Sequence, residues 1–417
     1  MKYQLTEIEN VKKASHRLKE TVRKTPFQYN ERLSQLTKTK LWLKREDLQE
    51  VRSFKIRGAY NKISSLNNNE RNKGVVCSSA GNHAQGVAKS CNLLKIEGVI
   101  FMPTITPRQK IEQVNMFGGK YVKVILDGDT YDDAYEAAKK YCNKNNKTFI
   151  HPFDDESVIE GQATLALEIL EQANEKIDAI IVPVGGGGLI SGVLSVFKQL
   201  SPETKIIGVE PKGAPSMSKS LTNNTVTSLD KIDPFVDGAS VKRVGEISYN
   251  LCQEYLDEML LVPEGKICQT ILNMYNKDAI VVEPAGAISV AALELYQYKF
   301  INQHVVCLIC GSNNDISRMS EIKEKALLYR NLKHYFLIKL PQRAGALKEF
   351  LADVLGPNDD ITHFEYTKKH YKETGVAIVG IEVQKANELD GLIERMKARG
   401  FFSDYLNNKE DVRQILI

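Results

Sequence analysis

The sequence predicts an α/β protein with two parallel-sheet subdomains, followed by a small α+β domain. Short β-branched apolar runs alternate with stretches of helical period from about residue 40 to residue 315, and turn residues separate them. This alternation is typical of strands that pair in parallel under covering helices. Near 320–335 the pattern changes, because a charged helical stretch leads into the apolar run 334–338. We therefore predict one part over 1–325 and a separate domain over 332–417.

Four apolar runs in the first part are predicted strands, and each has helical sequence nearby, which favours parallel sheets. They are 74–77, 99–102, 180–184 and 206–209. A chain of 417 residues with 42% apolar content is long enough for two such sheets with buried cores. In the second part, 340–350 predicts the end of a strand, a turn containing glycine and then a helix.

The composition argues against nucleic acid and membrane partners. The chain has 56 basic and 52 acidic side chains, so its formal charge of +4 provides no field for nucleic acid or anionic lipid. The N-terminus is polar, and no segment reaches the roughly 18 uninterrupted apolar residues that a membrane span needs. We expect a cytoplasmic protein.

The seven cysteines are odd in number and widely spread, which predicts reduced thiols and not a disulfide framework. Cys307 and Cys310 form a CxxC pattern within an apolar run. Residues three apart on a strand point to opposite faces, so these two thiols are badly placed to share a metal or a disulfide. A buried strand is the preferred interpretation, and no metal site is predicted.

The most informative segment is Gly185, Gly186, Gly187 and Gly188, followed by Leu189. It follows the predicted strand 180–184 and precedes a helical run. Backbone N–H groups free of side chains at a helix N-terminus bind phosphate. A flexible turn is the alternative, but ordering four glycines costs more chain entropy than an ordinary turn requires, so we favour anion binding.

Two further segments could carry chemistry. Lys55 has apolar neighbours and is followed by a predicted small-residue turn at Gly58, so desolvation could lower the pKa of its ammonium group and make it a nucleophile or base. Taken alone, a surface lysine on a helix explains it better. The loop 78–86 follows a predicted strand and offers N–H groups and amides that suit a carboxylate. His83 in that loop is interpreted as structural.

Together, the segments 53–59, 78–86 and 185–189 resemble the fold-type II pyridoxal-phosphate enzymes, specifically the threonine dehydratase branch. Each motif is moderately specific, and their order and separation strengthen the resemblance, which covers about residues 5–325. Four other segments are also similar to that family's pattern: 44–47, 235–239, 283–286 and 311–314.

The resemblance implies a role for each matching residue. Lys55 would hold pyridoxal 5'-phosphate as a Schiff base and later take the α-proton of the substrate. Gly185 to Gly188 with Leu189 would bind the cofactor phosphate, and Asn82 would donate to the phenolic oxygen. The substrate carboxylate would be bound by the loop residues Ser79, Ala80, Gly81 and Asn82. The implied reaction converts L-threonine, or L-serine, into a 2-oxo acid and ammonia.

Two positions qualify the resemblance. Where relatives carry a serine beside the pyridine nitrogen, this sequence has Cys310, with Ser312 as the alternative through a shifted turn; we favour Cys310. A neutral thiol would leave that nitrogen largely unprotonated, which favours elimination. Ala80 stands where similar serine racemases carry a catalytic serine, so racemisation is disfavoured. The racemase cation position also lacks its aspartate, which is Ser216 here, so a divalent-metal site is doubtful.

The C-terminal part resembles a single ACT-like regulatory domain. This resemblance implies an amino-acid effector, isoleucine as inhibitor with valine opposing it, while a purely structural dimerisation module has similar weight. We expect a homotetramer or homodimer that catalyses the first step of isoleucine biosynthesis. The alternatives are a β-replacement enzyme of the same fold and a non-catalytic amino-acid sensor, against which the presence of Lys55 argues.

Overall fold

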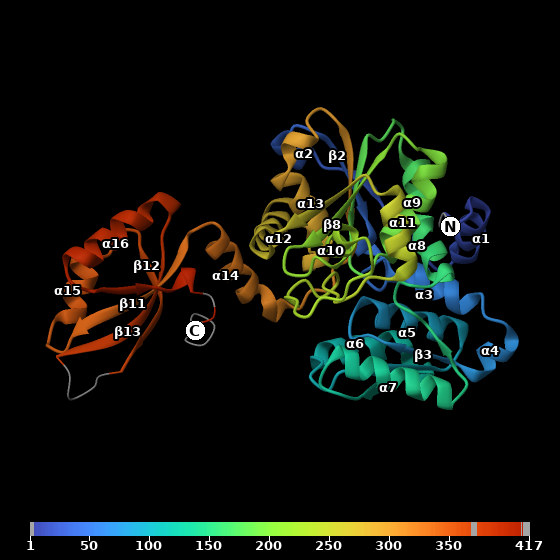
Figure 1. Ribbon diagram of the computed structural model, residues 1–417, viewed down its shortest axis with the longest axis horizontal. Coiled ribbons are helices and arrows are strands. Elements are labelled where there is room, and N and C mark those ends of the chain that lie inside the picture. The colour runs from blue at the N-terminus through green and yellow to red at the C-terminus, as the bar shows by residue number, and fades with distance from the viewer. Residues whose placement is uncertain (1–3, 368–372, 410, 412–417) are drawn as a thin grey trace. The chain divides into compact units, whose positions relative to one another are not determined.

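The computed structural model describes residues 4–367, 373–409 and 411, so the last residues of the predicted domain 332–417 lie outside it. The chain divides into two compact units, Met1–Ile316 and Ser317–Ile417 (Figure 1). Helix α14 (Met319–Tyr329) belongs to the second unit, because its residue Leu327 packs against that unit's core. The sequence-based boundary between 325 and 332 stays a prediction.

The first unit contains a six-stranded sheet in the order β1-β2-β10-β7-β8-β9. All neighbouring strands are parallel except β1 and β2, which pair antiparallel at one edge. The strands are β1 (Phe27–Tyr29), β2 (Lys40–Arg45), β7 (Ala179–Pro183), β8 (Lys205–Pro211), β9 (Glu258–Val262) and β10 (His304–Ile309). Strands β7 and β10 are buried along their whole length, as expected for central parallel strands.

Helices cover both faces of this large sheet. Helix α13 contacts four of its strands, whereas α9 contacts β7 and β8 and packs against α8 and α11, which lie beside it in Figure 1. The helices of this subdomain, some of which pack on other helices, are α1 (Ile8–Leu18), α2 (Glu31–Thr37), α8 (Glu156–Gln172), α9 (Gly188–Leu200), α10 (Ser216–Asn223), α11 (Glu246–Tyr255), α12 (Glu264–Asp278) and α13 (Pro284–Leu295).

A smaller, wholly parallel sheet in the order β5-β4-β3-β6 forms the second subdomain of the same unit. Helices α5 and α6 pack on one core of this sheet, and α7 packs on another. The elements are β3 (Val75–Ser78), β4 (Gly98–Met102), β5 (Val122–Leu126), β6 (Thr148–Phe149), α4 (Asn68–Lys73), α5 (Asn82–Leu94), α6 (Arg108–Gly118) and α7 (Tyr131–Lys144). The prediction of two parallel-sheet subdomains is confirmed.

One local prediction is wrong. The residues after Lys55 form no turn but continue helix α3 (Lys55–Ser64), with Gly58 inside it. Helix α3 packs directly on α8, and a Cβ on Gly58 would lie 2.8 Å from the backbone oxygen of Val158. Glycine is therefore required here for close helix packing, and the small residues after Lys55 mark a helix contact.

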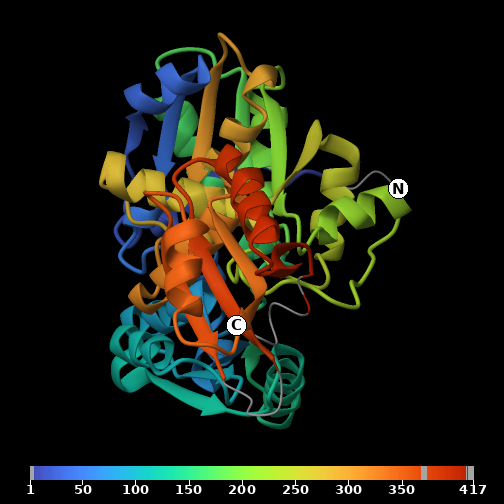
Figure 2. The ribbon, with the colours of Figure 1, turned by 90° about the vertical axis from the view of Figure 1, so that its left-hand side faces the viewer.

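The C-terminal unit is an antiparallel sheet in the order β12-β13-β11-β14, with α15 and α16 packed on one face (Figures 1 and 2). The elements are β11 (Lys333–Pro341), α15 (Ala346–Asp353), β12 (Asp360–Tyr366), β13 (Thr374–Glu382), α16 (Leu389–Ala398) and β14 (Phe402–Tyr405). The predicted strand, glycine turn and helix over 340–350 are β11, Gly345 and α15.

All seven cysteines are free and buried, as the sequence predicts. Among the described residues, no helix is both long and apolar enough to cross a membrane.

Candidate functional site

Lys55 is the first residue of α3, and its backbone is held by the segment that follows β10. Ser53 forms an antiparallel bridge with Gly311, and the amide of Phe54 donates to the carbonyl of Cys310 at 3.2 Å. The Nζ of Lys55 donates to the carbonyl oxygen of Pro152 at 2.8 Å. Burial lowers the pKa of Lys55 to about 8, although the neighbouring Cys310 and Glu283 oppose this shift. A fraction of the Lys55 side chains is therefore deprotonated near neutral pH.

The loop Ser79 to Asn82 joins β3 to α5, at the carboxyl edge of the small sheet. The Oγ of Ser79 accepts from the amide of Gly81 at 3.2 Å, and Asn82 is the first residue of α5. The first N–H groups of an α-helix have no partner within the helix, so this loop presents donors to a carboxylate. Ala80 is partly buried against the small-sheet core.

Asn82 connects this loop to two residues of the large subdomain. Its Nδ2 donates to Oε1 of Glu283 at 2.6 Å, and its Oδ1 accepts from the side-chain amide of Asn313. Burial, together with the nearby charge of Asp237, raises the pKa of Glu283 to about 7. Glu283 belongs to a segment that resembles the family, but no local pattern marked it as a site residue. Its partner lies 201 residues away.

Cys310 directly follows β10 and lies beside Lys55. Its Sγ donates to the carbonyl of Ala285 at 3.2 Å, and burial raises the pKa of the thiol well above its usual value. Cys310 is therefore a neutral thiol. The hydroxyl of Ser312 donates instead to the carbonyl of Asp47 at 3.2 Å, so the alternative residue already has a structural partner.

The glycine loop lies between β7 and α9 and has little room for side chains. Gly187 has φ of +97°, a conformation that favours glycine, and a Cβ on it would lie 2.4 Å from Cβ of Ser248. A Cβ on Gly186 would lie 2.2 Å from the ring of Phe153. Gly188 and Leu189 are the first two residues of helix α9, so their N–H groups have no acceptor within the helix.

The residues around this loop fit the phosphate of the implied cofactor. The Oγ of Ser248 is buried and has no hydrogen-bond partner among the described residues. It faces Gly187, so a phosphate in the loop would supply the acceptor that this hydroxyl lacks. Ser248 is the third residue of α11 (Glu246–Tyr255), and no local sequence pattern identifies it as a site residue.

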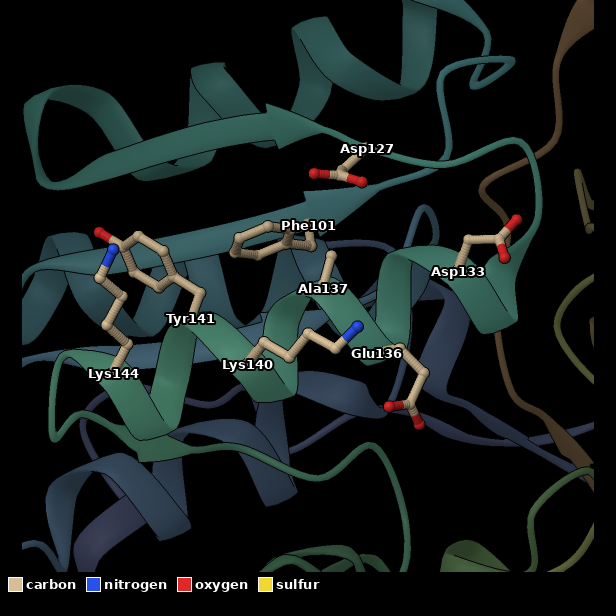
Figure 3. A pocket seen from close by; sticks show the side chains of 8 residues that line it. All are labelled: Phe101, Asp127, Asp133, Glu136, Ala137, Lys140, Tyr141 and Lys144. Carbon is tan, nitrogen blue, oxygen red and sulfur yellow. The ribbon is translucent and has the colours of Figure 1, made fainter.

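Contacts bring Lys55, Asn82 and Cys310 together, and the glycine loop is joined to Lys55 through Pro152 and Phe153. His83 has the structural role expected for it: its Nε2 donates to the carbonyl of Ile150 at 3.0 Å, and burial lowers its pKa to about 3. A separate surface groove, between α7 and the β4–β5 side of the small sheet, contains none of the predicted site residues (Figure 3).

No cluster of three or more metal-ligating side chains occurs in the described part of the chain. Glu210, at the end of β8 and near Ser216, accepts from the amides of Met217 and Ser218 at 2.6 and 2.9 Å. Burial raises the pKa of Glu210 to about 7. Its oxygens are thus engaged at the N-terminus of α10.

Two family models match the chain. Residues 18–311 match the model described as pyridoxal-phosphate dependent enzyme, which covers Lys55, the loop 79–82 and the glycine loop. Residues 324–416 match the model described as the C-terminal regulatory domain of threonine dehydratase.

Relatives of known name match over the whole length. The L-threonine dehydratase biosynthetic IlvA of Halalkalibacterium halodurans is 54% identical over 411 residues, which are 99% of both chains. The protein of the same name from Bacillus subtilis is 52% identical over 413 residues, covering 99% of this chain and 98% of the relative.

Solved structures agree with this assignment. The processed form of threonine deaminase isoform 2 from Solanum lycopersicum has a TM-score of 0.72 at 39% identity, covering 78% of this chain and 96% of its own. Maize serine racemase has a TM-score of 0.72 at 30% identity, covering 78% of this chain and 99% of its own. The chain therefore belongs to the pyridoxal-phosphate-dependent enzymes, in the family of biosynthetic threonine dehydratases that carry a C-terminal regulatory domain.

Proposed function

We propose that the protein converts L-threonine into 2-oxobutanoate and ammonia, with pyridoxal phosphate held at Lys55. The environment of the Lys55 amine carries this proposal. Burial lowers the pKa of the amine to about 8, and the neutral thiol of Cys310 lies beside it. When bound, the cofactor withdraws electrons from the carbon that bears the substrate's amino group, and so acidifies its α-hydrogen. Lys55 would accept that proton, because a partly buried amine with this pKa is a competent base.

We assign the other roles from position and chemistry. The N–H groups of Gly185 to Leu189, with the hydroxyl of Ser248, would hold the phosphate. The loop Ser79 to Asn82 would hold the carboxylate at the start of α5, and Asn82 would also donate to the cofactor's phenolic oxygen. Cys310 would contact the pyridine nitrogen, and as a neutral thiol it would not keep that nitrogen protonated.

We also propose that the C-terminal unit binds a branched-chain amino acid, isoleucine as inhibitor with valine opposing it. The turn before α15 supports this choice, because Gly345 has φ of +87° and a Cβ there would meet nothing within 4 Å. The turn is therefore open at Gly345, as an effector site there would require. We further propose a homotetramer or homodimer, located in the cytoplasm, where seven buried thiols stay reduced.

The test is release of 2-oxo acid from L-threonine and from L-serine by the purified protein with added pyridoxal phosphate. Release without any second nucleophile supports elimination and excludes β-replacement as the main reaction. Absence of release, with the cofactor demonstrably attached to Lys55, would contradict the proposal. Repeating the assay with isoleucine, with valine and with both tests the regulatory role. Rates independent of both amino acids would leave the C-terminal unit without that role.

A further inference from the structure

The five-residue segment from Ile150 to Asp154 carries the chain from β6 of the small sheet to α8 of the large subdomain. No catalytic pattern marks it in the sequence. Nevertheless, its residues contact Lys55, the glycine loop, and the helix that begins with Asn82. We propose that His151 is a positioning residue. By accepting hydrogen bonds at Nδ1 it fixes the conformation of this segment, and the segment in turn holds Lys55 and the glycine loop in their relative positions.

The imidazole of His151 shapes the turn by accepting two backbone hydrogen bonds. Its Nδ1 accepts from the amide of Asp154 at 2.8 Å and from the amide of Phe153 at 3.3 Å. Since Nδ1 is the acceptor, the proton of the neutral ring lies on Nε2. Burial lowers the pKa of His151 to about 4, so the ring keeps its acceptor at neutral pH.

The turn places two groups against the catalytic elements. The carbonyl oxygen of Pro152 accepts the 2.8 Å hydrogen bond from Nζ of Lys55. The ring of Phe153 lies so close to the glycine loop that a Cβ on Gly186 would approach it to 2.2 Å, and one on Gly188 would lie 2.9 Å from the Phe153 oxygen. A shift of the turn would therefore displace the amine and the phosphate-binding loop together.

The ends of the segment are tied to two more site elements. The carbonyl of Ile150 accepts from Nε2 of His83 at 3.0 Å, in the first turn of α5. The carboxylate of Asp154 accepts from the amides of Glu246 and Ile247, both at 3.0 Å, at the start of α11. Helix α11 carries Ser248, the buried hydroxyl that faces Gly187. The segment thus contacts α3, α5, the glycine loop and α11, which carry Lys55, Asn82, the phosphate-binding amides and Ser248.

A turn of this kind is usually closed by the side chain of Asn, Asp or Ser, which accepts from the amides two and three residues ahead. His151 does the same with a ring that also packs edge-on to Phe153, with centroids 4.8 Å apart and an interplanar angle of 89°. The imidazole therefore has two separable functions: it accepts hydrogen bonds and it supports the Phe153 ring.

Two substitutions separate these functions. His151→Phe keeps an aromatic ring but removes the acceptor, whereas His151→Asn keeps an acceptor at the δ position and removes the ring. We expect the dissociation constant of pyridoxal phosphate from the apoprotein to rise at least about ten-fold in His151→Phe, because two amides lose their acceptor. We expect His151→Asn to stay within about three-fold of the wild type.

The measurements are titration of the apoprotein with pyridoxal phosphate, and the fraction of cofactor fixed on Lys55 by borohydride, read by peptide mass spectrometry. His151→Ala replaces His151→Phe if the larger ring prevents folding, which thermal unfolding reports. Unchanged affinity in a folded variant without the acceptor would overturn the proposal. So would equal weakening in His151→Asn and His151→Phe. The roles of Pro152 and Phe153 rest on the proposed function. The binding measurements nevertheless need no substrate. A protein that binds the cofactor normally but releases no 2-oxo acid would therefore contradict only the proposed function.

Discussion

The side-chain amide of Asn82 donates a 2.6 Å hydrogen bond to Oε1 of Glu283, and this bond joins the substrate loop of the small subdomain to the start of α13. Burial of the carboxyl raises the pKa of Glu283 to about 7, and the nearby charge of Asp237 acts in the same direction. The hydrogen bond from Asn82 opposes the rise, because it stabilises the carboxylate. Glu283 is therefore close to half-protonated at neutral pH.

Replacing Glu283 with glutamine should make the free energy of unfolding less dependent on pH. The pKa of Glu283 is raised from its ordinary 4.5 to about 7 in the folded protein, so the folded state binds the proton more tightly. Wild-type stability should therefore fall as the pH rises from 4.5 through 7. Glutamine does not titrate, so the variant should not show this fall. Relative to the wild type, Glu283→Gln should gain on the order of 2 kcal/mol between pH 5.5 and pH 8.5. Urea unfolding at both values checks this, and a constant difference would refute the assigned pKa.

Lys55→Met should abolish turnover without destabilising the apoprotein at pH 7. Removal of the amine should lower the rate of 2-oxo acid release by at least about a thousand-fold. The pKa of Lys55 is lowered to about 8 by burial, so below that pH the folded wild type bears the cost of a charged, desolvated ammonium group. Methionine removes this cost, and the apoprotein should gain on the order of 3 kcal/mol at pH 7, a gain that shrinks as the pH rises from 8 to 10.5. Residual activity near the wild-type level would exclude Lys55 as the base.

Ala80→Ser should introduce measurable racemisation of L-serine. The residue lies in the loop that we assign to the substrate, and a methyl group cannot transfer a proton whereas a hydroxyl group can. D-serine, measured by chiral chromatography during turnover, should rise above the wild-type background. Ser79→Ala is the matched control, because it changes the adjacent position without adding a hydroxyl. Equal background in both variants would show that Ala80 does not determine the reaction outcome.

Local patterns were enough to predict the sheets and the glycine loop. Apolar runs such as 180–184 and the four glycines after them are marked by neighbouring residues, and the structure has strand β7 and helix α9 on either side. The surroundings of Lys55 were not predictable in this way. Its acceptor, Pro152, lies 97 residues away, and nothing near Lys55 in the sequence specifies that contact.

The small residues after Lys55 show why one local prediction failed. Gly58 indicates a turn in the sequence, but glycine is needed at this position because α3 packs closely on α8. A helix contact between distant segments leaves no signal in a single sequence. The same holds for Ser248, whose unpartnered hydroxyl becomes informative only when α11 is placed against Gly187. Tertiary contacts, and not local propensity, complete the candidate site.

Arg57 anchors α3 two residues after Lys55 through a buried ionic network. Its guanidinium donates to both oxygens of Glu46 at 2.8 and 2.7 Å, and to both oxygens of Glu168 at 2.7 and 2.9 Å. The Nζ of Lys44 donates to Glu168 at 2.6 Å. The network thus contains two positive and two negative groups, with the Arg57 and Glu46 side chains each only 1% exposed.

Arg57→Met should lower the free energy of unfolding by about 3–5 kcal/mol, because it leaves Glu46 and Glu168 with only Lys44 to balance them. The double variant Arg57→Met with Glu46→Gln restores charge balance and should recover roughly 1–3 kcal/mol of that loss. Urea unfolding at pH 7 measures both. Arg108→Met is the matched control, because its ion pair with Glu112 is exposed, with the two side chains at 90% and 61%, and should cost about 1 kcal/mol or less. A double variant no more stable than Arg57→Met would show that lost packing, and not the unbalanced charge, explains the effect.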